Sequence, residues 1–142
     1  MPRYKTLPDV AIADVCFEAE GKNLNELFEN AAFATEDIMV DTKTVKPKVE
    51  RIITLDQEKL EDLLYDFLSE LLFLKDTEGL VFSQLKVAIE KKKIYCLTAT
   101  GKGEVLDQKK HLWRADVKAV TLHMFKLKKR KNNWFCRVVL DI

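Results

Sequence analysis

Glycine, proline and cysteine are all scarce in this chain of 142 residues, which contains four, three and three of them, respectively. Together with 47% hydrophobic and 33% charged residues, this scarcity argues against a disordered or low-complexity chain. A chain of this length buries about 68 to 70% of the surface that its unfolded state exposes, which is enough for one core. We therefore expect a single folded domain over residues 1–142.

The chain also lacks an excess of charge of either sign. Its 24 Lys and Arg residues are balanced by 23 Asp and Glu residues, which leaves a formal net charge of +1. A protein that binds nucleic acid on its own usually presents a strong positive field to the phosphates. Any role on RNA is therefore expected to need a partner.

Long apolar runs and the common enzyme motifs are missing as well. No run approaches 18 uncharged apolar residues, and no apolar core follows the first basic residues, so we expect no membrane span, no secretion signal and a cytoplasmic location. Cys16, Cys96 and Cys136 form no CxxC pair and are expected to be reduced and buried. His111 and His123 lack a zinc-binding spacing, and no phosphate-binding glycine loop is present. An enzyme is not expected.

Helical periodicity begins after residue 22. Asn23 and Glu26 have the spacing of a capping box, which predicts a helix start. A mostly apolar stripe follows at helical spacing and consists of Leu24, Leu27, Phe28, Ala31, Thr35 and Ile38. Acidic residues, including Glu29 and Glu36, are expected outside this stripe. A second helix is predicted over residues 60–72, where leucines and Phe67 repeat at helical spacing, with Asp56 as its candidate cap.

Alternating patterns predict the strands. Residues 13–20 place Val15, Phe17 and Ala19 on one face and Asp14, Cys16, Glu18 and Glu20 on the other. Further strands are predicted at 49–55, 80–82, 85–89, 94–100, 117–127 and 134–140. Asn132 and Asn133 predict a hairpin turn, since Asn tolerates positive φ. The pattern indicates an α+β fold in which two helices cover one face of a largely antiparallel sheet.

The carboxyl terminus is unusual because the apolar segment RVVLDI reaches Asp141 and then ends at Ile142. If this strand is held in a sheet, the Asp141 side chain and the main-chain carboxylate of Ile142 supply two hard oxygen ligands. A third carboxylate nearby would complete a site for calcium or a similar cation. The alternative is an ordinary solvated terminus. The residues themselves do not decide between the two, and they do not identify the third acid.

Several blocks of the sequence resemble the archease family, in order and over almost the whole length. They are Ala13-Asp14-Val15, ENAAFATEDIMVD at Glu29 to Asp41, LLYDFLSELLFLKDTEGLVFS at Leu63 to Ser83, VKAVTLHM at Val117 to Met124, and RVVLDI at the end. In archeases a His-Thr-Ala-Asp motif supplies an aspartate that joins the penultimate aspartate and the terminal carboxylate around a metal ion, usually calcium. By position, the resemblance implies the ligands Asp14, Asp141 and Ile142 here.

The resemblance also implies a role for Lys118, which matches a lysine linked to family activity, although a solvated strand lysine is the alternative. Some positions depart from the family. Ala11-Ile12 replace His-Thr, Leu122 replaces Tyr, and Leu112-Trp113-Arg114 replace Glu-Pro-Lys, so that Trp113 offers a changed partner contact. Asp9 is an alternative ligand, because the register of this amino-terminal segment is open.

The function implied by the resemblance is that of an accessory protein. Archeases promote the guanylylation and multiple turnover of RtcB-type tRNA-splicing RNA ligases, so the implied partner is the ligase, and tRNA is reached indirectly through it. Two alternatives remain from the residues. One is direct RNA binding through Lys126 to Lys131, near Trp134, and the other is a chaperone-like interaction module.

Overall fold

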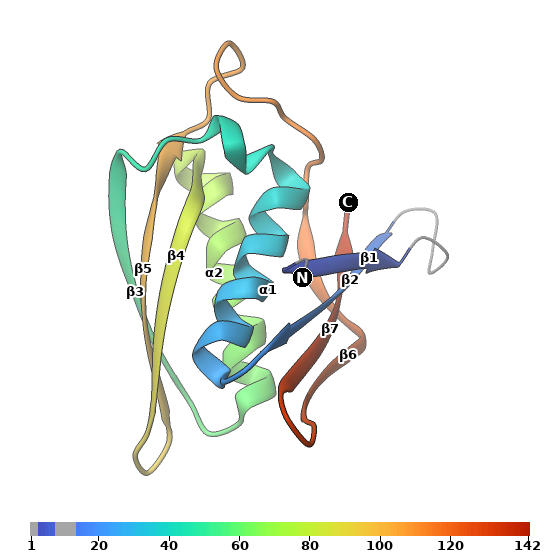
Figure 1. Cartoon of the computed structure of the whole chain (residues 1–142). Helices are drawn as coiled ribbons and strands as arrows, with labels where there is room; N and C mark the ends of the chain where they lie inside the picture. Colours follow the sequence, from blue (N-terminus) through green and yellow to red (C-terminus); the bar gives the residue numbers. More distant parts are fainter. Residues whose placement is uncertain (1–2, 8–13) are drawn as a thin grey trace.

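The computed structural model describes residues 3–7 and 14–142 of the chain. In order, its elements are β1 (Tyr4–Leu7), β2 (Asp14–Gly21), α1 (Leu24–Met39), the short 3-10 helix η1 (Thr42–Thr44), β3 (Val49–Gln57), α2 (Leu60–Glu78), β4 (Leu80–Lys91), β5 (Tyr95–Val105), β6 (Ala119–Lys129) and β7 (Trp134–Asp141) (Figure 1). Among the described residues, neither α-helix is long and apolar enough to cross a membrane.

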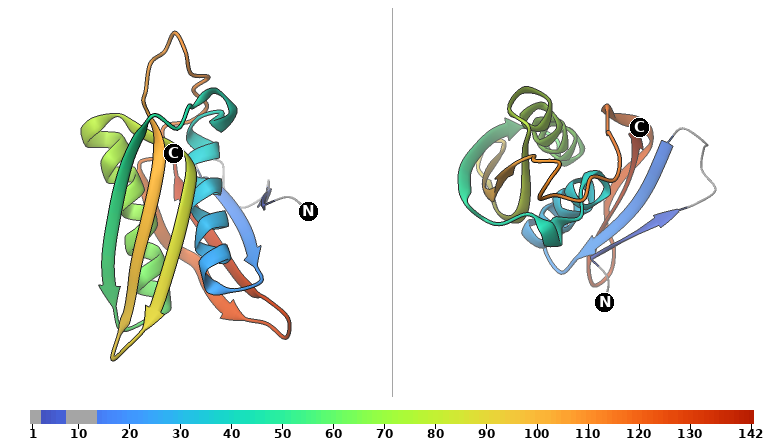
Figure 2. Two further views of the ribbon diagram at one scale, coloured as in Figure 1. Left: turned by 60° about the vertical axis from the view of Figure 1, so that its left-hand side comes forward. Right: turned by 90° about the horizontal axis from the view of Figure 1, so that it is seen from above.

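The strands form two antiparallel sheets, in the orders β1-β2-β7-β6 and β3-β5-β4. Both helices lie between the sheets, because α1 contacts β2 and β4 while α2 contacts β3 and β6 (Figures 1 and 2). The predicted α+β class is therefore confirmed. The structure adds that the strands are divided between two sheets, each covered by the helices on one face.

The core lies where the two helices meet. Phe28 of α1 and Phe67 of α2 are fully buried, and their rings stack with centroids 6.3 Å apart. The predicted apolar stripe of each helix faces this core, where each fully buried large side chain contributes roughly 1.5 to 3 kcal/mol. The amphipathic pattern therefore located both helices, although α2 continues beyond its predicted end at residue 72 to Glu78.

The helix starts confirm one predicted cap and correct the other. The Asn23 side chain accepts a hydrogen bond from the backbone N–H of Glu26 at 2.9 Å, as predicted. Asp56 does not cap α2, because β3 continues to Gln57 and places Asp56 opposite Cys96. The chain turns only after this pairing ends, and α2 begins at Leu60 without a side-chain cap.

The hairpin that joins β6 and β7 is confirmed, but its turn differs from the prediction. It is closed by a hydrogen bond from Arg130 N to Asn133 O at 2.8 Å. Among the described residues, Met124 and Gly79 have positive φ, and the two asparagines of the turn do not. Asn133 instead donates from its side chain to Glu20 Oε2 at 3.2 Å, so its role is to connect the hairpin to β2.

Helix α1 also covers the open edge of β4. Three side chains of α1, Asn25, Glu29 and Glu36, accept hydrogen bonds from backbone N–H groups of this edge strand. The donors are Ile89, Val87 and Phe82, at 2.9, 2.8 and 3.1 Å, respectively. An edge strand otherwise presents unpaired N–H groups to solvent or to other chains. Helix α1 is therefore attached to the sheet by directional bonds as well as by packing.

A bulge in β4 makes this arrangement possible. Phe82 is paired with Gly103 and Gln84 with Lys102, which leaves Ser83 as an extra residue without a partner in the register. In a regular strand, the N–H groups of residues five apart point in opposite directions. Because of the extra residue, Phe82 and Val87 both direct their N–H groups toward α1. Two strands were predicted at 80–82 and 85–89, but they form the single strand β4, because the bulge at Ser83 interrupts the alternation without ending the strand.

Glu36 was expected outside the apolar stripe, and this expectation is wrong. Its side chain is completely buried between α1 and β4, where Oε1 accepts the Phe82 N–H and Oε2 has no hydrogen-bond partner. Burial raises the pKa of this carboxyl to about 8. Glu36 therefore carries a proton at neutral pH and acts as a neutral acceptor for the edge strand.

We expect the Glu36→Gln variant to lose a pH dependence that the wild-type protein shows. The Glu36 pKa lies at about 8 in the folded state, against an ordinary value of 4.5, so the folded state binds more protons between these two pH values. The free energy of unfolding should therefore fall as pH rises through this window, by at most roughly 1.4 kcal/mol per pH unit, and level off above it. Gln keeps the acceptor but cannot ionise.

Urea unfolding at several pH values between about 5 and 8 would measure this difference. The matched control is Glu61→Gln at the exposed start of α2, which should follow the wild-type curve. Parallel curves for wild type and Glu36→Gln would contradict the assignment of a neutral buried carboxyl.

Candidate metal and partner site at the carboxyl terminus

The carboxyl-terminal strand is held in the middle of a sheet. β7 lies between β2 and β6, and its residues Val138, Val139 and Leu140 are fully buried. The Ile142 side chain follows the strand and packs against the same core as Leu140. The last residues are therefore ordered by pairing on both sides and by packing, which is the condition that the candidate site requires.

Asp14 and Asp141 lie directly opposite each other in the β2–β7 pair. The predicted alternation of β2 is confirmed, since Phe17 and Ala19 belong to the core, so Asp14 and Asp141 belong to the face of the sheet directed away from the helices. Side chains of directly opposite residues share a face, with Cβ atoms about 4.5 to 5.5 Å apart. The fold thus brings together two aspartates that are separated by almost the whole chain.

Lys118 approaches the same point from β6. Its backbone N–H donates a hydrogen bond to the carbonyl oxygen of Asp141 at 2.7 Å, immediately before Ala119 pairs with Asp141. The Lys118 side chain is exposed. The hydrogen bond and charge of Lys75 are the main causes of the lowered pKa of Asp116, and the charge of Lys118 lowers this pKa further. The lysine is therefore positioned beside the aspartate pair, at the surface.

The donor set fits a hard cation. The described residues contain no group of three His, Cys, Asp or Glu side chains that could hold a metal ion, so two aspartates require a ligand of another kind. The main-chain carboxylate of Ile142, one residue beyond Asp141, would supply the further oxygen group in the predicted ligand set. Carboxylate oxygens without sulfur or imidazole suit calcium or magnesium better than zinc. Asp9 and Ala11-Ile12 lie outside the described residues.

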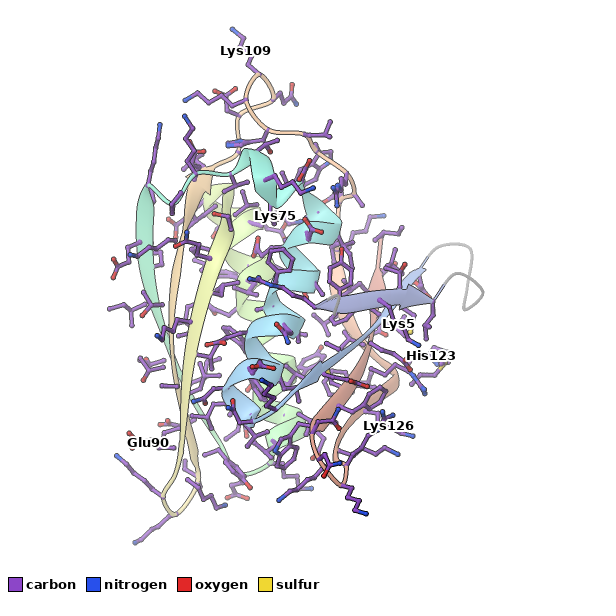
Figure 3. All side chains as sticks on the ribbon, in the orientation of Figure 1. Lys5, Lys75, Glu90, Lys109, His123 and Lys126 are labelled. Atoms are coloured by element: carbon purple, nitrogen blue, oxygen red, sulfur yellow. The ribbon has the colours of Figure 1, made fainter. Side chains whose placement is uncertain are left out.

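Lys75 connects the end of α2 to the segment immediately before β6. Its side chain is 5% exposed, and its ammonium group contacts Asp76 Oδ1 at 2.6 Å, Asp116 Oδ1 at 2.9 Å and Val117 O at 2.9 Å. Figure 3 shows Lys75 inside the end of the molecule at which the long loop emerges. The three contacts match the three donors of an ammonium group, and they fix the segment that leads into Lys118.

The charge of Lys75 is retained despite its burial. Burial by itself lowers the pKa of this ammonium group, but the hydrogen bonds and charges of Asp76 and Asp116 outweigh this effect and raise the pKa above its ordinary value. Sequence reasoning missed Lys75. The available signal was its spacing, four residues after Leu71 and seven after Leu68, which places a charged residue on the buried stripe of α2.

Two of the three cysteines are fully buried, as predicted, and Cys96 is not. Cys16 and Cys136 are fully buried, Cys96 is half-buried, and all three are free thiols. Burial raises the pKa of Cys136 to about 12 and also raises that of Cys16. Because the thiolate is the reactive form, the two fully buried cysteines behave as small hydrophobic residues, as predicted.

Comparison with known proteins establishes the family of this chain. The model of the archease protein family (MTH1598/TM1083) matches residues 4–142. The chain belongs to the archease family. It is 44% identical to the protein archease of Thermococcus kodakarensis over 132 residues, which cover 92% of this chain and 93% of that protein. The corresponding identity to the protein archease of Methanothermobacter thermautotrophicus is 43% over 131 residues, with the same coverage.

Solved structures support the same fold for this archease. The solution structure of Methanobacterium thermoautotrophicum protein 1598 superimposes with a TM-score of 0.88 and 41% identity over 100% of both chains. A crystal structure from Thermotoga maritima, described as an archease and possible chaperone, has a TM-score of 0.64 at 19% identity and covers 96% of both chains. The second likeness shows the fold alone.

Lys75→Met should lower the free energy of unfolding by about 1 to 3 kcal/mol. Methionine keeps a long apolar stem, but the carbonyl of Val117 and the two carboxylates lose their donor. Asp76 and Asp116 are 54% and 65% exposed, so they can be rehydrated, which limits the loss. Urea unfolding would measure the effect, and amide hydrogen exchange at Lys118 should accelerate.

The control for this variant is Lys92→Met in the β4–β5 hairpin, where the lysine side chain is 68% exposed. This change should alter stability by less than about 0.5 kcal/mol. Equal stability of the two variants would show that the Lys75 contacts do not fix the start of β6.

Proposed function

We propose that this archease activates an RtcB-type tRNA-splicing RNA ligase, promoting its guanylylation and multiple turnover through a metal-binding acidic site. The proposed ligands are Asp14, Asp141 and the terminal carboxylate of Ile142, and Lys118 is the proposed contact to the ligase complex. The observation that carries the proposal is the direct pairing of Asp14 with Asp141 at the end of a buried central strand.

The paired aspartates are hard to explain by folding alone. Like charges directly opposite each other destabilise an antiparallel pair, so these residues cost stability unless a cation is present. Bound calcium would offset two of the three negative charges of Asp14, Asp141 and the terminal carboxylate. The rigid sheet would hold all three oxygen groups in place before binding, which reduces the entropy lost on ligation.

The surroundings of the site suit a protein partner. Lys118 is exposed and would offer a point charge to a phosphate in the nucleotide site of the ligase. Leu122 and Met124 on the edge strand β6 are 70% and 42% exposed, and Leu112 and Trp113 of the preceding loop are 59% and 41% exposed. Exposed apolar and aromatic side chains of this kind are common at protein interfaces. In this proposal the ligase is the catalyst and the archease is not an enzyme.

The metal site can be tested by thermal and chemical unfolding with and without calcium. In chelator, Asp14→Asn should be more stable than wild type by roughly 0.2 to 1 kcal/mol, because it removes the repulsion from Asp141. With calcium at about one hundred times its dissociation constant, the wild-type protein should gain about 2.7 kcal/mol and the variant much less.

Two further proteins sharpen this test. Glu20→Gln changes a carboxylate on the same strand and face as Asp14 and should keep the calcium response. A Gly-Ser extension after Ile142 moves the terminal carboxylate away from Asp141 and should abolish the response. A calcium response that survives both Asp14→Asn and the extension would refute this ligand set.

Activation itself should be measured with the cognate ligase. Guanylylation and multiple-turnover RNA joining should increase on addition of the wild-type protein, and Asp14→Ala should reduce the stimulation at least about tenfold, since the acidic site loses one of its three proposed ligands. Glu20→Ala is the matched control and should stimulate as wild type does. Circular dichroism should show that all three proteins are folded.

The outcome distinguishes the proposal from its alternatives. Stimulation by Asp14→Ala at the wild-type level would exclude the acidic site. If the wild-type protein did not stimulate the ligase, suppression of aggregation in unrelated proteins would favour a chaperone-like module. Loss of RNA affinity on changing Lys128, Lys129 and Lys131 would favour direct RNA binding by the β6–β7 hairpin.

A further inference from the structure

A pocket away from the acidic site lies where η1, the segment before β3 and the loop after β5 meet. It has a volume of about 300 Å³ and is lined by Thr44, Lys46, Lys48, Glu104 and Lys110. We refer to it as the lysine pocket. Its three lysines come from two segments that are more than 60 residues apart in the sequence. Tertiary folding, and not a basic run, therefore brings these charges together.

A buried hydrogen bond between Glu104 and His111 holds the two lysine-bearing segments in place. Glu104 Oε1 accepts the backbone N–H of Lys46 at 2.7 Å and contacts His111 Nε2 at 3.1 Å. His111 Nδ1 accepts the backbone N–H of Asp107 at 2.9 Å, so the proton of a neutral ring lies on Nε2 and is donated to Glu104. The Glu104 and His111 side chains are 9% and 1% exposed. Buried hydrogen bonds therefore hold the wall of the pocket in one conformation.

Glu104 in the pocket wall is charged and offsets only one of the three lysine charges. The hydrogen bonds from Lys46 N and His111 lower the pKa of Glu104 to about 2, and its second oxygen lies 3.9 Å from the ammonium group of Lys48. Among the described residues, Lys46 and Lys110 form no ion pair. The lining therefore carries three positive charges against one negative charge.

The positive surface continues beyond the pocket. Lys43 of η1 and Lys109 of the loop are exposed neighbours of the lining residues, and Lys109 marks the tip of this end of the molecule in Figure 3. Holding several ammonium groups near one another is unfavourable unless an anion is present. The lining contains no aromatic side chain on which a base could stack, so positive charge is the feature that this pocket offers to a ligand.

We propose that the lysine pocket binds a phosphate group, either of an RNA backbone or of a free phosphate compound. Lysine ammonium groups bind phosphate oxygens as point charges, and the three lysines that line this pocket supply the charge that one or two phosphates require. Lys43 and Lys109 would extend the contact along a strand with several phosphates. The proposal does not rest on the acidic site or on activation of a ligase.

The test compares two triple variants with equal charge changes. The pocket variant is Lys46→Gln/Lys48→Gln/Lys110→Gln, and the control is Lys91→Gln/Lys92→Gln/Lys93→Gln in and beside the β4–β5 hairpin. Glu90, next to these control lysines, marks the opposite end of the molecule from Lys109 in Figure 3. Binding of a labelled single-stranded RNA 12-mer is followed by fluorescence anisotropy at several salt concentrations, and pyrophosphate titration is followed by calorimetry.

For the wild-type protein we expect RNA binding that weakens with salt. The pocket variant should lose at least tenfold in affinity, and the slope of log affinity against log salt should fall by about 2, because each phosphate contact on a single strand contributes about 0.7. The control variant should remain within about twofold of wild type. Thermal unfolding should show that both variants are folded.

Other outcomes identify the source of the phosphate or overturn the proposal. If the wild-type protein binds pyrophosphate but not RNA, and the pocket variant alone loses this binding, then the site takes a free phosphate compound. Equal losses in both triple variants would show general charge attraction and overturn the proposal. Binding of neither probe by the wild-type protein would also overturn it, as would RNA binding that depends on Lys128, Lys129 and Lys131 but not on the pocket.

Discussion

The covering of the β4 edge by helix α1 is the constraint on which the rest of this fold depends. Asn25, Glu29 and Glu36 provide acceptors for three N–H groups that would otherwise be unpaired at a sheet edge. A buried backbone N–H without a partner is costly, so this row of bonds fixes both the rotation and the position of α1. The bulge at Ser83 directs the three donor N–H groups to one side of β4. The protonated Glu36 carboxyl is the most deeply buried of the three acceptors.

Once α1 is fixed, it determines how the second sheet is placed. Its opposite side contacts β2 and β7, and the core between the sheets is shared with α2. β7 therefore becomes a buried central strand, and its last residues are held in register with β2 and β6. A helix position set by one sheet thus supports the geometry of the acidic pair, which lies on the far face of the other sheet.

Buried polar contacts set the two ends of the loop between β5 and β6. Near its start, Glu104 and His111 hold the lysine pocket together, and near its end Lys75 fixes the segment before Lys118. In both places a charged group is buried with its partners satisfied, which favours one conformation of the segments around it. The loop between β5 and β6 therefore connects the lysine pocket to the segment beside the Asp14–Asp141 pair.

The sequence determined the local structure and, through its resemblance, the family. Periodicity located both helices, and alternation placed Asp14 on the face away from the core, because these patterns reflect burial of one side of an element. The sequence did not determine that β3 continues past Asp56 or that Glu36 is buried. It also did not determine the role of Lys75 or the division of the strands into two sheets. Each of these depends on a partner distant in the chain, such as Cys96, Phe82 or Asp116. The meeting of Asp14 with Asp141 was implied by the resemblance, but its physical cause is the strand order, which only tertiary packing decides.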